Sequence, residues 1–120
     1  MSKIVRLKRR ADFLAVSAQR RKCVTPGLIL QAGVRPAETA APPRLGFTAS
    51  RKVGIAVKRN RARRRLKEAA ERVFGRYAAP GHDYVVIARG ETLTREFSDL
   101  VADLETAMRR LGGKEQRAGG

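Results

Sequence analysis

Hydrophobic residues recur at helical spacing in the middle of this 120-residue chain. Five of them fall at i, i+3, i+4, i+7 and i+8, and these are Leu66, Ala69, Ala70, Val73 and Phe74. This spacing lines one face of an α-helix. We therefore predict a helix that begins at Ala56 or Val57 and ends at Phe74, with Gly75 as its C-cap.

Weaker helical patterns lie near both ends of the chain. A short helix is expected from about Arg10 to Gln19. A last helix follows Thr94, which can cap it, and Gly112-Gly113 would stop it. The apolar stripe of this last helix consists of Phe97, Leu100, Val101, Leu104, Met108 and Leu111.

Three segments read as β-strands. Residues 28–34 and 45–50 alternate between two faces, and a loop rich in Pro and Ala, residues 36–43, joins them. Residues 84–88 are apolar on both faces, so we expect an interior strand that is covered on both sides. Gly46 within the second strand indicates that another group approaches its backbone closely.

The elements follow one another as helix, strand, strand, helix, strand, helix. This order predicts one α+β domain over residues 1–111, built as a two-layer sandwich, and residues 112–120 read as a flexible C-terminal tail. No apolar stretch approaches the ~20 residues of a membrane span, and the first residues lack the apolar run of a secretory signal. The single cysteine, Cys23, cannot form an internal disulfide, which fits a reducing cytosol.

The excess of basic residues in the first half of the chain is the strongest indication of function. The net charge is +16, and residues 1–67 hold 19 Lys/Arg against 2 Asp/Glu. Residues 51–67 contain nine of these cations and no acid. Like charges at i, i+4 destabilise a helix, so a sequence that keeps them is more readily explained by phosphate binding than by a solvated charged face.

The helical register divides the basic residues. Four arginines should point away from the apolar stripe, namely Arg61, Arg64, Arg65 and Arg72. Arg59 and Arg63 should instead lie on the stripe side, beyond the edge of the core. The neighbouring Asn60 can hydrogen-bond a phosphate, a base edge or a nearby arginine, or simply face solvent. The turn Ser50–Gly54 could offer backbone N–H groups and two cations to a phosphate.

Other side chains carry less information. Phe13 and Phe47 lie near basic residues and could stack on bases, although core packing is the favoured explanation for each ring taken alone. His82 and Cys23 have no partners at catalytic or metal-ligand spacing, and no nucleotide-binding P-loop is present. The acids of the last helix fit a polar helix face. We therefore predict neither a catalytic nor a metal site in this chain.

Residues 45–68 resemble the signature of the bacterial ribonuclease P protein subunit. The hallmark is Arg59-Asn60-Arg61 followed by Arg63-Arg64. Asp12-Phe13 with Val16 resembles the first helix of that family, and residues 83–89 resemble its strand that ends in Ala-Arg. The resemblance extends over about residues 5–111.

This resemblance implies an α/β sandwich with a left-handed βαβ crossover, like the second domain of ribosomal protein S5. It also implies the auxiliary subunit of an endoribonuclease whose catalytic RNA, using Mg²⁺, removes the 5′ leader of precursor tRNA. Its partners would be the ribonuclease P RNA and precursor tRNA, in the cytoplasm, with no membrane, obligate protein partner or protein-bound cofactor. The subunit would broaden the substrate range and raise the affinity for metal and substrate.

The resemblance further implies two binding surfaces. The RNA subunit would contact Arg51, Lys52, Lys58, Arg59, Asn60, Arg61, Arg63, Arg64, Arg65 and Lys67. The single-stranded leader would occupy a cleft between the first helix and the sheet, lined by Phe13, Phe47, Ser17, Gln31, Arg9 and Arg10. Ser17 stands where relatives often carry a second aromatic residue, and Gln31 falls near a cleft position that can be aromatic in relatives. Both departures shift weight toward polar and phosphate contacts.

Three other functions are weighed against this one. A ribosomal or other structural RNA-binding protein would explain the charge and the fold but not the specific motif. A nucleoid DNA-binding protein would explain only the charge. A stand-alone nuclease would need clustered acids or histidines, which the sequence lacks.

Overall fold

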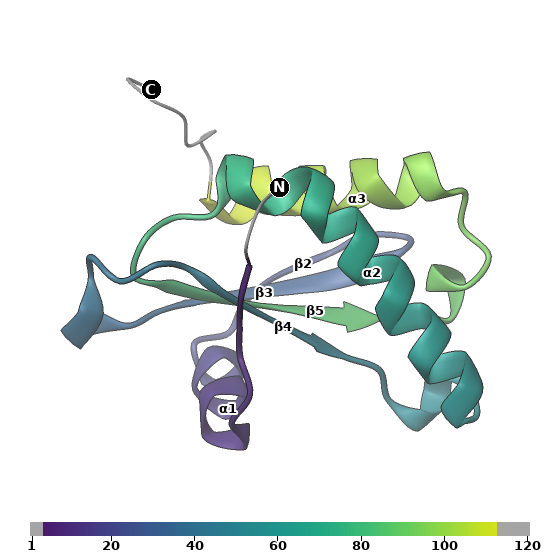
Figure 1. Cartoon of the computed structure of the whole chain (residues 1–120), viewed down its shortest axis with the longest axis horizontal. Coiled ribbons are helices and arrows are strands. Elements are labelled where there is room, and N and C mark those ends of the chain that lie inside the picture. Colours follow the sequence, from purple (N-terminus) through teal and green to yellow (C-terminus); the bar gives the residue numbers. More distant parts are fainter. Residues whose placement is uncertain (1–3, 113–120) are drawn as a thin grey trace.

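The computed structural model describes residues 4–112, which form a sheet with helices on both faces (Figure 1). Three short 3₁₀ turns, η1 (Pro36–Glu38), η2 (Arg51–Val53) and η3 (Gly90–Thr92), connect the elements. The strands are β1 (Val5–Arg6), β2 (Arg21–Val24), β3 (Leu28–Val34), β4 (Arg44–Thr48) and β5 (His82–Ala88). The helices are α1 (Arg10–Ala18), α2 (Ala56–Tyr77) and α3 (Phe97–Gly112).

The five strands form one mixed sheet in the order β1-β4-β5-β3-β2. β4 runs parallel to β1 and β5, whereas β3 is antiparallel to β5 and β2. The predicted α+β class and the interior position of residues 84–88 are confirmed. Two strands were missed: β1 has only two residues, and β2 begins with Arg21 and Lys22, whose charges hide the alternation.

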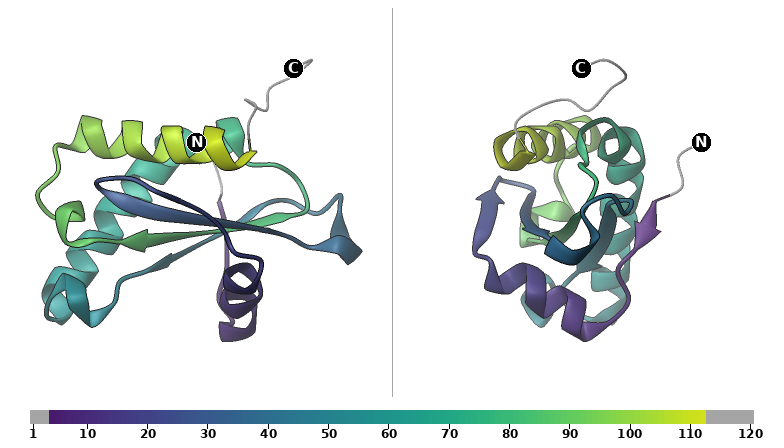
Figure 2. Two further views of the ribbon diagram at one scale, coloured as in Figure 1. Left: turned by 180° about the vertical axis from the view of Figure 1, so that it is seen from behind. Right: turned by 90° about the vertical axis from the view of Figure 1, so that its left-hand side faces the viewer.

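The helices divide between the two faces of the sheet (Figure 2). α2 and α3 cover one face, where Tyr84 and Val86 of β5 join the main core. α1 covers the other face, where Val16 packs with Leu7 and Val85. The sheet is therefore covered on both sides, which is why β5 is apolar on both of its faces.

β4, α2 and β5 form a βαβ unit between neighbouring parallel strands. Followed from β4 through α2 to β5 in Figure 1, the crossover is left-handed. This hand runs against the strong preference for right-handed crossovers. Periodicity carries no information about it, and only the family resemblance anticipated it.

Two predicted helix ends are wrong. α2 does not end before Gly75 but continues to Tyr77, with Ala78 as its C-cap. Tyr77 is buried and its hydroxyl donates a hydrogen bond to Glu105 of α3 at 2.7 Å, so tertiary contacts extend the helix past the glycine. Thr94 does not cap α3, which begins only at Phe97; its backbone N–H instead bonds the carbonyl of Glu91.

Candidate nucleic-acid interface

The apolar stripe of α2 fixes the helix on the sheet. Ala62 and Leu66 are completely buried, and the same stripe continues to Phe74. The opposite side of the helix carries side chains into solvent. The exposed cations of the preceding turn and of the helix up to Lys67 are Arg51, Lys52, Lys58, Arg61, Arg64 and Lys67.

Two arginines that the helical register placed on the stripe side, Arg59 and Arg63, make hydrogen bonds near the start of α2. Arg59 donates from Nη1 to the carbonyl oxygen of Gly54 at 3.0 Å. Arg63 donates from Nη2 to Oδ1 of Asn60 at 2.6 Å, so the asparagine pairs with a neighbouring arginine. Both arginines are half-buried, and their contacts hold a dense group of positive charges in fixed positions.

Arg65 differs from its expected environment. It was predicted to face outward with Arg61 and Arg64, but it is half-buried, whereas those two side chains are exposed. Nε donates to the carbonyl oxygen of Thr92 at 2.9 Å, and Nη2 donates to that of Arg95. These acceptors lie 27 and 30 residues away in sequence, so no local pattern could have revealed them.

The turn before α2 is also well ordered by its own contacts. Ser50 Oγ accepts a hydrogen bond from the backbone N–H of Lys52 at 3.3 Å. Gly54 adopts φ +143°, a conformation that other residues rarely adopt, and the aliphatic stem of Lys58 lies against it. The turn therefore presents Arg51 and Lys52 beside the first turn of α2.

A second basic surface lies on the α1 face of the sheet. The ring of Phe13 rests on Gly46, where an added Cβ would lie 2.5 Å from Phe13 Cε1. This is the close approach that the glycine in the strand indicated. Lys8 and Arg10 line a pocket together with Phe13 and Thr48 of β4.

A neighbouring pocket on this face is polar. Ser17 and Gln31, predicted to share the cleft, line it together with Arg20 and Lys22. Lys22 is the partner of Gln31 in the β2–β3 ladder, which places both side chains on the same face. Sequence analysis missed Arg20 and Lys22 because β2 itself was not recognised. No aromatic residue lines this second pocket.

The prediction that Phe47 shares a cleft with Phe13 is wrong. Alternation along β4 turns Phe47 toward α2, on the sheet face opposite Gly46. Phe47 is buried there, with the guanidinium carbon of Arg6 4.8 Å from its ring centroid. The alternative of core packing holds for Phe47.

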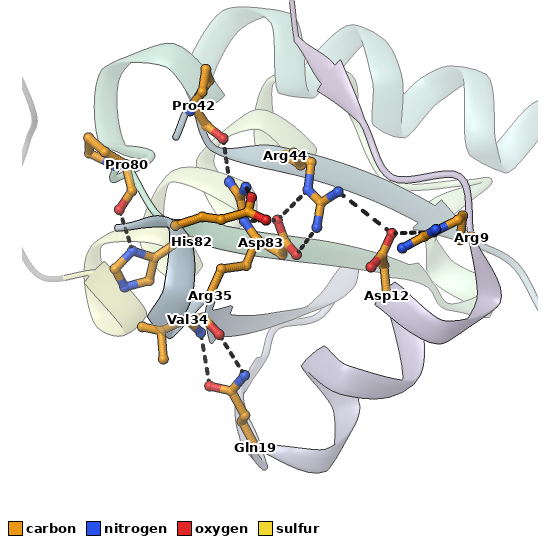
Figure 3. A network of polar contacts seen from close by, with 11 residues as sticks. Arg9, Asp12, Gln19, Val34, Arg35, Pro42, Arg44, Pro80, His82 and Asp83 are labelled. Carbon is orange, nitrogen blue, oxygen red and sulfur yellow. Dashed lines mark hydrogen bonds and ion pairs between the residues drawn. The ribbon is translucent and has the colours of Figure 1, made fainter. Parts of the chain in front are cut away.

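Arg9 lies at one end of α1, next to a network of charged groups (Figure 3). Its side chain is exposed, and Nε is 3.7 Å from Asp12. Asp12 is also 3.6 Å from Arg44, which binds the buried Asp83 through two hydrogen bonds of 2.8 and 2.7 Å. Hydrogen bonding to Asp83 raises the pKa of Arg44 above its ordinary value, against the opposing effect of desolvation. Arg35 completes the network with Nε 3.0 Å from Asp83.

Within residues 4–112, no group of three or more His, Cys, Asp or Glu side chains is arranged to hold a metal ion. His82 Nδ1 lies 3.0 Å from the carbonyl oxygen of Pro80, and Cys23 is buried. Nor does this part of the chain contain a helix that is long and apolar enough to span a membrane.

Comparison with known proteins gives consistent matches over nearly the whole chain. A family profile described as Ribonuclease P matches residues 1–112. The ribonuclease P protein component of Paramagnetospirillum magneticum is 53% identical over 119 residues, which cover 96% of this chain and 88% of that protein. The component of the same name from Gluconacetobacter diazotrophicus is 48% identical over 107 residues, covering 89% and 90% of the two chains.

Solved structures match as well. The RNase P protein from Thermotoga maritima superposes with a TM-score of 0.69 at 26% identity, covering 92% of this chain and 98% of that one. The RNase P protein from Staphylococcus aureus gives a TM-score of 0.73 at 24% identity, covering 90% and 95%, and supports the fold alone.

Proposed function

Because this chain belongs to the Ribonuclease P family, as the protein component of that tRNA-processing ribonuclease, we propose that it acts by binding RNA on two separate surfaces. The basic face of α2 and its preceding turn docks on the catalytic RNA subunit. The α1 face of the sheet captures the single-stranded 5′ leader of precursor tRNA. Binding at both surfaces places the leader junction beside the RNA active site in the cytoplasm.

The observation that carries this proposal is the separation of two cationic surfaces by the sheet. Arg61 and Arg64 are exposed on α2, on one side. On the other side, Phe13 and the pocket of Ser17 and Gln31 are bordered by Arg10 and Lys22. A rigid positive helix suits the fixed phosphates of a folded RNA, whereas a cleft with a partly exposed ring suits unpaired nucleotides.

Arginine chemistry favours this assignment of α2. A guanidinium can bind two phosphate oxygens at once and keeps its charge at any physiological pH. The contacts of Arg59 with the preceding turn and of Arg63 with Asn60 orient these side chains before RNA arrives. Preorganisation of this kind lowers the entropic cost of association.

In the proposed mechanism the protein contributes no nucleophile. Magnesium ions bound by the RNA would stabilise the attacking and leaving oxygens of the phosphodiester. The protein would neutralise phosphate charge and hold the leader, which raises the affinity for substrate and for metal and broadens the range of substrates accepted.

Reconstitution tests the proposal. The purified chain is added to a bacterial ribonuclease P RNA at low magnesium, and cleavage of precursor tRNA is measured with and without the protein. We expect the protein to stimulate cleavage by the RNA and to be inactive alone. No stimulation would refute the proposal, and cleavage by the protein alone would favour a stand-alone nuclease.

A further inference from the structure

Three consecutive apolar residues, Ile55-Ala56-Val57, stand exposed where α2 begins. Ile55 is 68% exposed and Val57 is 70% exposed, more than any other large apolar side chain among residues 4–112. Neither packs on the described core. β-branched residues are also not strong helix formers, so local helix propensity does not explain their presence. We call these three residues the apolar tip.

A backbone turn and two hydrogen bonds define the position of the apolar tip. Gly54 sets the direction of the chain with φ +143°, and the stem of Lys58 covers that glycine. Arg59 donates hydrogen bonds to two consecutive carbonyl groups of the turn. Its side chain bonds Gly54 O at 3.0 Å, and its backbone N–H bonds Ile55 O at 2.9 Å. The tip is therefore an apolar surface that the turn presents to solvent.

The charges around the apolar tip identify the kind of partner. Arg51 and Lys52 precede it, Lys58 and Arg61 follow it, and all four are exposed. A second copy of this chain would bring the same positive charges to the contact and be repelled. An unpaired nucleotide fits both features, because its base has an apolar face and its phosphates are negative.

We propose that an unpaired base of the ribonuclease P RNA packs against Ile55 and Val57 while the flanking cations hold its phosphates. This contact rests on the proposed function and adds a base-contacting element to a surface that otherwise binds phosphates. It is distinct from the leader site, because the first turn of α2 lies beyond the end of β4 and apart from α1 (Figures 1 and 2). It lets the protein distinguish one position on the folded RNA from other phosphate-rich surfaces.

A double variant, Ile55→Thr with Val57→Thr, tests the contact while keeping a β-branched side chain at each position. Affinity for the ribonuclease P RNA is measured by filter binding across a salt series. We expect the dissociation constant to rise about tenfold as apolar contact is lost. The slope of log affinity against log salt should stay unchanged, because no cation is removed. The matched control, Val5→Thr with Val34→Thr, changes two exposed valines elsewhere and should leave binding unchanged.

Chemical probing gives a second readout. Dimethyl sulfate and a carbodiimide together report on all four unpaired bases. We expect wild-type protein to protect at least one base that regains reactivity with the double variant, while other protections persist. Failure of the wild-type chain to bind the RNA would refute the proposed function itself. If the double variant binds the RNA with wild-type affinity, only this inference is refuted. The inference is also refuted if sedimentation shows that the wild-type protein forms a dimer and that the double variant does not.

Discussion

The ring of Phe13 lies directly on the backbone of Gly46, so that a Cβ at Gly46 would come within 2.5 Å of Phe13 Cε1 and 2.6 Å of Cζ. The same Cβ would be 3.1 Å from the Cβ of Leu7. Gly46 lies 33 positions after Phe13 in the sequence. Contact with this strand residue thus sets the orientation of the partly exposed Phe13 ring. Only glycine in β4 leaves room for it.

The substitution Gly46→Ala should therefore displace the ring. We expect a loss of about 1–3 kcal/mol in the free energy of unfolding, as for other overpacked sites. Weaker binding of precursor tRNA with a leader should accompany it. Urea denaturation and leader-dependent binding measure the two effects. Gly90→Ala is the control, because an added Cβ there meets nothing within 4 Å; equal effects of the two substitutions would contradict the prediction.

Replacement of Phe13 itself separates stacking from packing. Phe13→Ala should cost about 1–3 kcal/mol of leader binding if a base stacks on the ring. Affinity is compared for precursor tRNA and for mature tRNA without a leader, each bound to the holoenzyme. Phe47→Ala is the matched aromatic control and should reduce stability without a leader-specific effect, because Phe47 is buried on the other face. Equal losses for both substrates with Phe13→Ala would indicate a packing role.

The two phenylalanines also show how far the sequence could predict the structure. Alternation along residues 45–50 correctly separated Gly46 from Phe47, and the helical stripe of α2 is buried as predicted. Assigning both rings to one cleft ignored that alternation. The pockets on the α1 face could be only partly predicted, because Arg20 and Lys22 reach them through the unrecognised strand β2.

Long-range contacts explain the features of α2 that the sequence did not predict. The helical period predicted an outward-facing Arg65, but the connection from β5 to α3 brings two carbonyl acceptors to its guanidinium. Tyr77 extends α2 past Gly75 through burial and a bond to Glu105. Neither effect has a local signal. A helix period gives the direction of a side chain, whereas its partners depend on the tertiary structure.

Arg64 and Arg65 are neighbours in sequence, and we expect opposite consequences when each is replaced. Arg64→Ala should weaken binding to the RNA subunit and flatten the salt slope by up to ~0.7–0.9 for one lost phosphate contact. Its stability should stay within about 0.5 kcal/mol of wild type, because the side chain is exposed. Binding to the RNA subunit across a salt series measures the slope, and urea denaturation measures the free energy of unfolding.

Arg65→Ala should instead destabilise the fold by about 1.5–3 kcal/mol, because the carbonyl groups of the buried Thr92 and the half-buried Arg95 lose a charged donor. Its salt slope should change less than that of Arg64→Ala. The reverse pattern, a flattened slope with unchanged stability, would show that Arg65 contacts phosphate and leaves its carbonyl partners when RNA binds.

Gly75 lies inside α2, not at its end, so replacing it should stabilise the protein. Apart from its chain neighbours and the nearby backbone of its own helix, no atom lies within 4 Å of a Cβ added at Gly75, and the backbone there is helical. Gly75→Ala should raise the free energy of unfolding by about 0.5–1 kcal/mol, the difference in helix propensity between the two residues. Thermal or urea denaturation measures this change. Destabilisation would mean that the helix needs the flexibility of glycine near Tyr77.

The last prediction concerns Asp83, whose buried carboxylate holds two arginines at the end of the sheet (Figure 3). Asp83→Asn keeps the shape of the side chain but removes its charge, leaving Arg35 and Arg44 without their common partner. Removing one member of a buried ion pair costs about 3–5 kcal/mol, and we expect the lower end because the side chain of Arg44 is 26% exposed. Urea denaturation of wild type and variant gives the value.

The same network reaches α1, because Arg44 lies 3.6 Å from Asp12. A double-mutant cycle between Asp83→Asn and Asp12→Asn should therefore show a coupling energy of at least ~0.5 kcal/mol. Asp99→Asn, an exposed acid in the first turn of α3, is the control and should cost less than about 1 kcal/mol. Additive effects of the two network substitutions would show that Asp83 stabilises the sheet alone and does not help to hold α1, and with it Phe13, over Gly46.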